Sequence, residues 1–163
     1  MLIFIYGEDS FSSQQHLDSL LNKAKAEGSE VHIFRDESAD CEIIAPILSG
    51  SGLFSSKKMV VIKNALDNKS VREPLADYLD SRTISDDVTL IIYQAGTIDK
   101  RLGLIKKLLK DAEAKEFASP EPYTVEAWIK RWVEQAGKNI EPNAVRHLME
   151  IVGTDLHRAK SES

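Results

Sequence analysis

The sequence predicts an α/β fold in which a mostly parallel, doubly wound sheet is followed by a small all-α lid unit. Three observations predict it. Short apolar runs such as Leu2–Tyr6 alternate with segments of helical periodicity up to residue 118. The stretch Ser119-Pro-Glu-Pro122 then interrupts the alternation. Beyond it only helical periodicity is found, and alternation of strands with helices favours a parallel sheet covered on both faces.

Runs rich in β-branched and aromatic residues predict strands at residues 2–6, 31–34, 59–62 and 88–93. A fifth strand is expected at residues 114–117. Apolar spacing predicts helices at residues 12–27, 40–48, 71–79 and 102–109.

Two of these helices carry start signals. We expect Ser12 and Gln15 to form a capping box on the first. Asp40 is the expected cap of the second, where Pro46 predicts a kink or a late start.

The predicted organisation is an ATPase-like α/β domain at residues 1–118, a linker at 119–122 and a small helical domain at 123–163. The last domain holds two helices, the second opening at Pro142, and the start of a third that is unfinished at Ser163. The length of 163 residues suffices for this arrangement.

Composition excludes several classes of function. A net charge of -5 disfavours tight DNA binding by the chain alone. The single cysteine, Cys41, makes neither an internal disulfide nor a four-ligand zinc site, and the four histidines lack metal-binding spacing. We therefore expect no metal and no cofactor. No apolar stretch is long enough for a membrane span, and the start reads as a strand, so a cytoplasmic chain without membrane contact is expected.

The turn after the first strand lacks the groups that hold phosphate. A P-loop needs a second glycine and a lysine, which free backbone amides and neutralise charge. Here the turn reads Tyr6-Gly-Glu-Asp-Ser-Phe-Ser-Ser13, and its two acids would repel a phosphate. The dyads Glu8-Asp9 and Asp86-Asp87 are interpreted as caps or turn residues rather than catalytic pairs.

The strand ends also lack the aspartate that holds magnesium in P-loop enzymes. The third strand ends at Lys63-Asn64 and the fourth at Tyr93. The sequence therefore predicts a P-loop-ATPase-like fold without a nucleotide site and without catalytic residues.

The remaining feature is an apolar pair, Leu53-Phe54, in the glycine- and serine-rich segment 49–56. Such a pair on an adaptable loop suits insertion into a partner's pocket. Composition alone favours the alternative that the pair folds beneath the start of the third strand.

The chain resembles the delta subunit of the bacterial DNA polymerase III clamp loader over essentially its whole length. The most specific stretch is LFSSKKMVVIKN at residues 53–64, and the second is LIFIYGEDSF at 2–11. Further matches lie at Asp99–Leu102, at residues 108–117, at Trp128-Ile129 and at residues 153–156.

The resemblance implies an AAA+-like subunit that binds no ATP and opens the sliding clamp with a Leu-Phe wedge. Leu53 and Phe54 are then the clamp-binding residues, with Ser51 where some relatives carry a further apolar residue. Lys57 and Lys58 are expected at the rim. The implied partners are the beta sliding clamp and the gamma or tau and delta prime subunits, with DNA contacted only indirectly or weakly. Polymerase activity would belong to the holoenzyme. The third, collar domain of the family is missing from the sequence.

Two alternatives stay open. One is a degenerate nucleotide-binding regulator with weak affinity in the former cleft. The other is a nucleic-acid-binding adaptor that uses the basic residues of the fourth helical segment, although a solvated helix face explains them as well. Those residues are Lys100, Arg101, Lys106, Lys107 and Lys110.

Overall fold

A computed structural model describes residues 1–35, 39–50, 57–119 and 122–152. The elements run in the order β1 (Leu2–Gly7), α1 (Ser10–Ala26), β2 (Glu30–Arg35), α2 (Cys41–Leu48), β3 (Lys58–Lys63), α3 (Lys69–Ser81), β4 (Val88–Ala95), α4 (Gly103–Asp111), β5 (Glu113–Glu116), α5 (Pro122–Gln135) and α6 (Pro142–Val152). Each predicted strand is present, lengthened by one or two residues or shifted by one.

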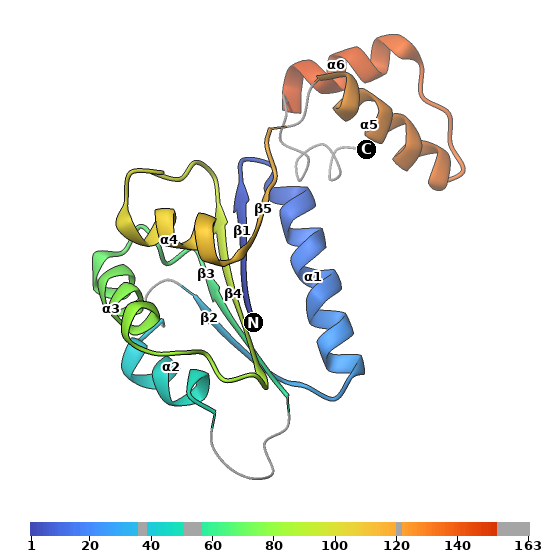
Figure 1. The fold of residues 1–163 in the computed structure, drawn as a ribbon. Helices are drawn as coiled ribbons and strands as arrows, with labels where there is room; N and C mark the ends of the chain where they lie inside the picture. The colour runs from blue at the N-terminus through green and yellow to red at the C-terminus, as the bar shows by residue number, and fades with distance from the viewer. Residues whose placement is uncertain (36–38, 51–56, 120–121, 153–163) are drawn as a thin grey trace.

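The five strands form one sheet in the order β2-β3-β4-β1-β5, and every pairing is parallel. In the middle of the sheet, Val61 of β3 lies opposite both Ile33 of β2 and Ile91 of β4. Helices lie on both faces (Figure 1). The predicted α/β, doubly wound class is therefore confirmed.

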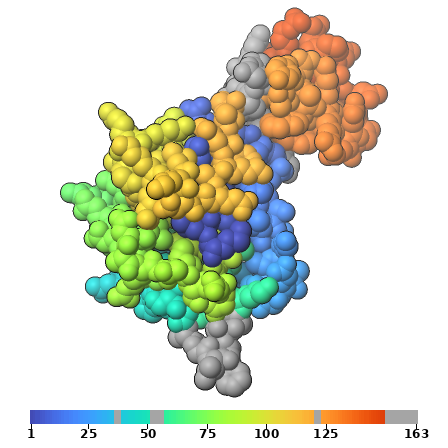
Figure 2. Space-filling view, viewed as in Figure 1, coloured from blue at the N-terminus to red at the C-terminus, as the bar shows by residue number. Residues whose placement is uncertain are grey.

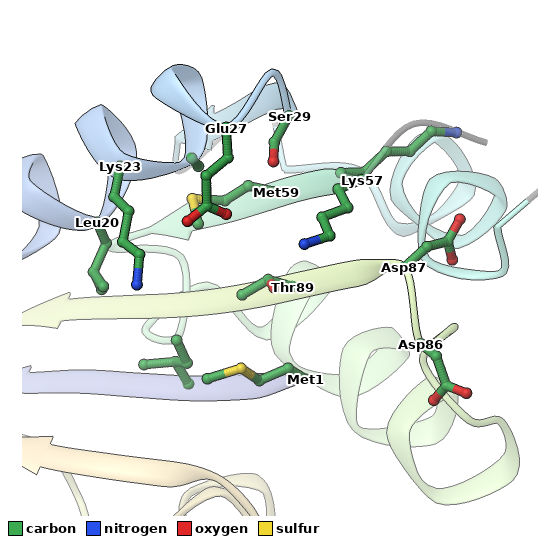
Figure 3. Close-up of a pocket in the computed structure, with 13 residues that line it drawn as sticks. Met1, Leu20, Lys23, Glu27, Ser29, Lys57, Met59, Asp86, Asp87 and Thr89 are labelled. Carbon is green, nitrogen blue, oxygen red and sulfur yellow. The ribbon is translucent and has the colours of Figure 1, made fainter.

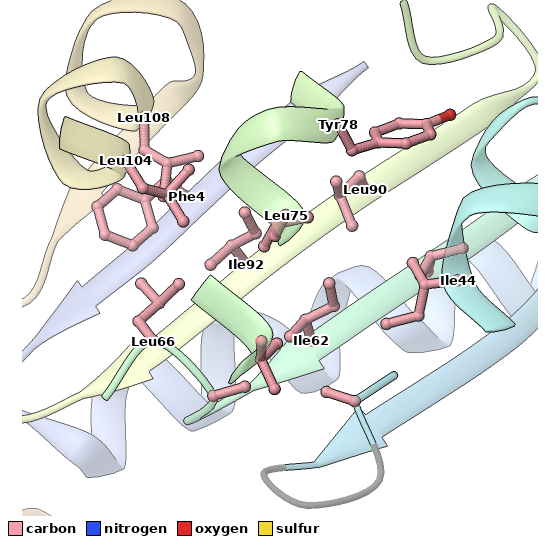
Figure 4. Close-up of a cluster of buried hydrophobic side chains, with 14 of the residues drawn as sticks. Phe4, Ile44, Ile62, Leu66, Leu75, Tyr78, Leu90, Ile92, Leu104 and Leu108 are labelled. Carbon is pink, nitrogen blue, oxygen red and sulfur yellow. The ribbon is translucent and has the colours of Figure 1, made fainter. Parts of the chain in front are cut away.

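Side chains alternate between two hydrophobic clusters because successive strand residues point to opposite faces. On one face, α2, α3 and α4 cover Phe4, Ile62 and Ile92 with Ile44, Leu75, Leu108 and their neighbours (Figure 4). On the other face, α1 alone packs Leu17, Leu21 and Ala24 on Ile5, Val61 and Ile91. Burial on both faces explains why the central strands read as continuous apolar runs.

The start of α1 differs from the predicted capping box. The helix begins at Ser10, and the Asp9 carboxylate accepts a hydrogen bond from the Ser12 backbone N–H at 2.9 Å. Asp9 therefore caps the helix, because it stands where its side chain reaches the free amides of the first turn. This agrees with the interpretation of Glu8-Asp9 as a capping pair.

The start of α2 agrees with its predicted cap. The Asp40 carboxylate accepts from the Glu42 backbone N–H at 2.8 Å. The helix runs from Cys41 through Pro46, so the alternative of a late start is wrong.

A third buried cluster connects α5 and α6 with the α/β part. Val125 and Ile129 of α5 and Val145 of α6 are buried together with Phe11 of α1. In the space-filling view, α5 and α6 project from the body formed by the sheet and its helices (Figure 2). The division at residues 119–122 stays a prediction; β5 ends before it, and α5 begins at Pro122. Among the described residues, no helix combines the length and apolar composition that crossing a bilayer requires.

Two glycines provide a test of the fold. Gly7 has φ +131, and a Cβ built there would lie 2.1 Å from the Phe117 carbonyl oxygen, whereas a Cβ at Gly103 meets no atom within 4 Å. We expect Gly7→Ala to lower the free energy of unfolding by about 2 kcal/mol or more. Gly103→Ala, the matched control, should leave stability unchanged or raise it by up to about 1 kcal/mol. Urea unfolding measures both, and equal effects of the two changes would contradict the assigned backbone contact.

Candidate functional site

The turn between β1 and α1, where P-loop proteins hold phosphate, is filled by the protein's own backbone. The segment after β5 runs against Gly7, and the Asp9 backbone N–H donates to the Phe117 carbonyl at 3.0 Å. The Phe117 N–H donates in turn to the Tyr6 carbonyl at 2.7 Å. A backbone amide of the turn that could face a ligand is therefore already hydrogen-bonded within the chain.

The amino terminus of α1 carries its own anion. Helix amino termini attract negative charge because their first amides lack partners. Here the Asp9 side chain, only 7% exposed, takes that position and binds the Ser12 amide. A phosphate would have to displace a buried carboxylate of the same sign, which is unfavourable.

The ends of β3 and β4 are joined to each other. The Asn64 side-chain oxygen accepts from the Ala95 backbone N–H at 2.9 Å. The buried Gln94 accepts from the Leu66 N–H at 3.2 Å and donates to Asp67 at 2.9 Å. The carboxyl edge of the central strands, where open α/β sheets bind ligands, is therefore held by structural hydrogen bonds.

A cleft of about 250 Å³ remains at this edge, between the ends of β1 and β5. Its lysine, Lys100, lies 3.5 Å from Glu116, which also accepts from the Tyr6 hydroxyl at 3.1 Å. Burial, followed by the effects of Glu116, raises the pKa of Tyr6. Glu8 adds a second carboxylate to the lining. The cleft therefore has more negative than positive side chains and does not suit a triphosphate.

The opposite, amino-terminal edge of the sheet carries the segment that contains the apolar pair. Ser51, Leu53 and Phe54 lie outside the described residues, and the structure describes the two ends of the segment. At one end, Gly50 has φ +65 and lies so close to Ser85 that a Cβ would approach its hydroxyl to 2.7 Å. At the other end, the Lys58 backbone N–H donates to the Asp87 carbonyl at 2.9 Å.

Both ends are thus held by one turn. The Ser85 N–H also donates to the Leu48 carbonyl at 3.1 Å, and the Ser85 hydroxyl donates to the Asp87 carboxylate. Asp86 and Asp87 serve as turn residues, as the sequence indicated. We call residues 85–87 the anchoring turn.

A cleft of about 300 Å³ opens beside this edge, between the end of α1 and the starts of the strands (Figure 3). Its apolar lining comes from Met1, Ile3, Leu20, Ala24 and Met59. Charged side chains of both signs surround it, namely Lys23, Glu27, Lys57, Lys58, Asp86 and Asp87. Lys57 is exposed and Lys58 half-buried.

The basic residues considered for a nucleic-acid adaptor are mostly paired. Arg101 lies 2.9 Å from Asp99, and Lys107 lies 3.0 Å from Asp80 and 3.3 Å from Asp111. With Lys100 on Glu116, three of the five cations have carboxylate partners. This arrangement is typical of the solvated face of an amphipathic helix.

The titratable side chains that sequence analysis set aside have structural roles. Burial raises the pKa of the half-buried Cys41 thiol, which lies 3.7 Å from the Val71 carbonyl. His16 packs beside Phe117, and burial lowers the pKa of its imidazole. Within the described ranges, no group of three or more His, Cys, Asp or Glu side chains is arranged to hold a metal.

Comparison with known proteins adds the decisive observation. The family model for the DNA polymerase III delta subunit matches residues 3–118, more than two thirds of the chain. The chain belongs to this delta subunit family. The resemblance inferred from residues 2–11 and 53–64 is therefore confirmed. No curated protein matches the sequence.

Solved structures agree with the family at the level of the fold. The DNA clamp loader delta protein of Bacillus subtilis is similar with a TM-score of 0.62 and 16% identity, covering 99% of this chain and 51% of that one. The RuvB Holliday junction branch migration motor of Thermotoga maritima gives 0.58 and 15%, covering 98% and 52%. Domain III of the replication initiation protein DnaA from the same organism gives 0.61 and 16%, covering 98% and 72%. The chain thus spans about half the length of the delta protein it matches.

Several residues of the delta-family fold were not found by sequence reasoning. In the sequence, Asn64 was noted only because it stands where P-loop enzymes carry a magnesium-binding aspartate. Its φ of +52 and its hydrogen bond with Ala95 show a structural role. A Lys-Asn pair at a strand end signals a left-handed turn, because asparagine tolerates positive φ. Gln94 lay beyond the predicted end of its strand, and Phe117 acts through its backbone, which leaves no side-chain signal.

Because the turn between β1 and α1 is closed, we predict that nucleotide has no effect on the stability of the protein. We expect no change in melting temperature with ATP and magnesium, because a ligand that does not bind the native state cannot stabilise it. Asp9→Ala should lower the free energy of unfolding by about 1 kcal/mol through loss of the cap, without creating ATP binding. Thermal shift and urea unfolding measure the two effects. A dose-dependent rise in melting temperature of the unaltered chain would favour the nucleotide-binding regulator instead.

Proposed function

We propose that this chain is a non-catalytic delta-type subunit of the clamp loader, which binds and opens the DNA sliding clamp through Leu53 and Phe54. Family membership supports the clamp-loader role. The residues at the carboxyl edge support a role without nucleotide, since Asp9, Asn64 and Gln94 are engaged in hydrogen bonds within the chain. Protein contact remains as the means of action.

The observation that carries the proposal is the anchoring of the residues on either side of Leu53-Phe54. Leu48 and Lys58, which flank the pair, are both hydrogen-bonded to the anchoring turn at the edge opposite the former nucleotide turn. Fixed ends lower the conformational entropy that the segment loses on binding, so less of the contact energy is spent on ordering it.

The pair supplies enough free energy for a specific contact. Burial of one leucine and one phenylalanine contributes roughly 3 to 6 kcal/mol before ordering costs. Ser51, in place of an apolar residue found in some relatives, makes the contact smaller. Lys57 and Lys58 act at the rim, where charges affect the association rate more than the affinity.

Opening follows from differential binding. A wedge that contacts the open clamp interface better than the closed one shifts the clamp toward the open state by that difference in affinity. Partner subunits of the gamma or tau and delta prime type would bind the ATP that drives cycling. In this proposal the chain works in the cytoplasm and meets DNA through the assembly.

The proposal predicts a specific loss of clamp binding. Leu53→Ala with Phe54→Ala should weaken clamp affinity by about a hundredfold or more while leaving the melting temperature unchanged. A matched control, Ile33→Ala with Ile43→Ala, removes two apolar side chains that are 43% and 56% exposed elsewhere on the protein. Calorimetric titration of the beta clamp with each variant measures the affinities. If the first variant and the unaltered chain bound the beta clamp with equal affinity, the proposed contact through Leu53 and Phe54 would be wrong.

A further inference from the structure

The two tryptophans of the protein, Trp128 and Trp132, line one cleft of about 290 Å³ between α1 and α5. They stand four residues apart on α5 and therefore on the same helix face. Phe11 of α1 meets Trp132 edge-on, with ring centroids 5.4 Å apart. Both indoles pack on the third buried cluster and stay partly exposed, so their free surface faces the cleft.

Polar side chains with unused hydrogen-bonding capacity surround these rings. Gln15 of α1 and Arg131 and Gln135 of α5 line the cleft and are exposed. No hydrogen bond or ion pair to another described residue engages these three side chains. Ser12 completes the lining with a hydroxyl.

The charge of the cleft is opposite to that of the protein. Among the described residues that line the cleft, Arg131 is the one with a charged side chain, although the chain as a whole has a net charge of -5. The cleft at the former phosphate edge is different, because Glu8 and Glu116 line it. An anionic occupant is therefore favoured between α1 and α5.

Indole faces, amides and one guanidinium together match the chemistry of an unpaired nucleotide. Aromatic side chains stack on any base, guanidinium binds phosphate, and amides pair with base edges. We propose that the cleft between α1 and α5 binds a base with its phosphate from single-stranded nucleic acid. A duplex would not fit this chemistry, because its bases are stacked and paired with each other.

This site is separate from the proposed clamp contact. It lies at the amino terminus of α1, whereas the anchoring turn lies at the opposite edge of the sheet. Clamp binding and nucleic-acid binding can therefore be tested, and rejected, independently of each other. With a single cation in the lining, we expect weak binding, in the range of about 10 to 100 µM at low salt.

Tryptophan emission of the full chain tests the proposal directly, since both fluorophores line the cleft. A short oligothymidylate should quench the emission saturably, and the matching duplex should not. An abasic oligonucleotide and heparin should compete poorly, because they supply charge without bases. Equal competition by either, or no saturable quenching, would overturn the proposal. Equal affinity for thymidine monophosphate would identify a free nucleotide as the ligand and would overturn the proposal that the cleft binds single-stranded nucleic acid.

Two variants separate stacking from charge. Trp128→Leu should weaken binding roughly five- to a hundredfold, read from the anisotropy of a labelled oligonucleotide. Arg131→Gln should weaken it less and reduce the slope of log affinity against log salt by about one. Lys138→Gln, just beyond α5, removes the same charge from an exposed residue outside the lining and should change neither. If Trp128→Leu fails to fold by circular dichroism, Arg131→Gln decides, and an unchanged salt slope in that variant rejects the site.

Discussion

The close approach of the Phe117 backbone to Gly7 is the constraint on which the site architecture depends. Only a residue without Cβ fits there, since a Cβ would lie 2.1 Å from the carbonyl oxygen. The contact lets the Asp9 amide bond to Phe117, and this places Asp9 where its carboxylate caps α1. One backbone contact thus closes the turn that in P-loop proteins is open to phosphate. The loss of a lysine and a glycine alone would leave an empty cradle, whereas this arrangement fills it.

The first turn of α1 also contacts α5 and α6. Phe11, two residues after Asp9, enters the buried cluster of Val125, Ile129 and Val145. Phe11 therefore links α1 to α5 and α6 through apolar contact within the chain, and this link involves no ligand.

The sequence was sufficient for features that depend on side-chain pattern. Continuous apolar runs predicted β1, β3 and β4, because strands buried on both faces have no polar alternation. The absence of the glycine and lysine that bind phosphate in a P-loop was equally visible in the sequence. Features made by backbone geometry were not: the Gly7–Phe117 contact joins residues 110 positions apart and has no local signature. The capping box at Ser12 was wrong because Asp9, three residues earlier, competes for the same amide and reaches it. The Trp128–Trp132 spacing was visible, but the cleft needed α1 as its second wall.

The two edges of the sheet differ in how completely their polar groups are used, and this difference bears on function. At the carboxyl edge, Asn64, Gln94 and the lysine of the remaining cleft all bond to protein partners. Binding a ligand there would require breaking these interactions, of which the Leu66–Gln94 hydrogen bond is buried and worth about 1 kcal/mol, or more when a partner stays unsatisfied. At the amino edge, the bonds of the anchoring turn hold backbone and leave the Lys57 and Lys58 side chains facing solvent or half-buried. A partner that docks there breaks no bond of the fold. The free-energy cost of binding is therefore lower at the edge that carries the anchoring turn, and this asymmetry is what the proposed contact through that edge requires.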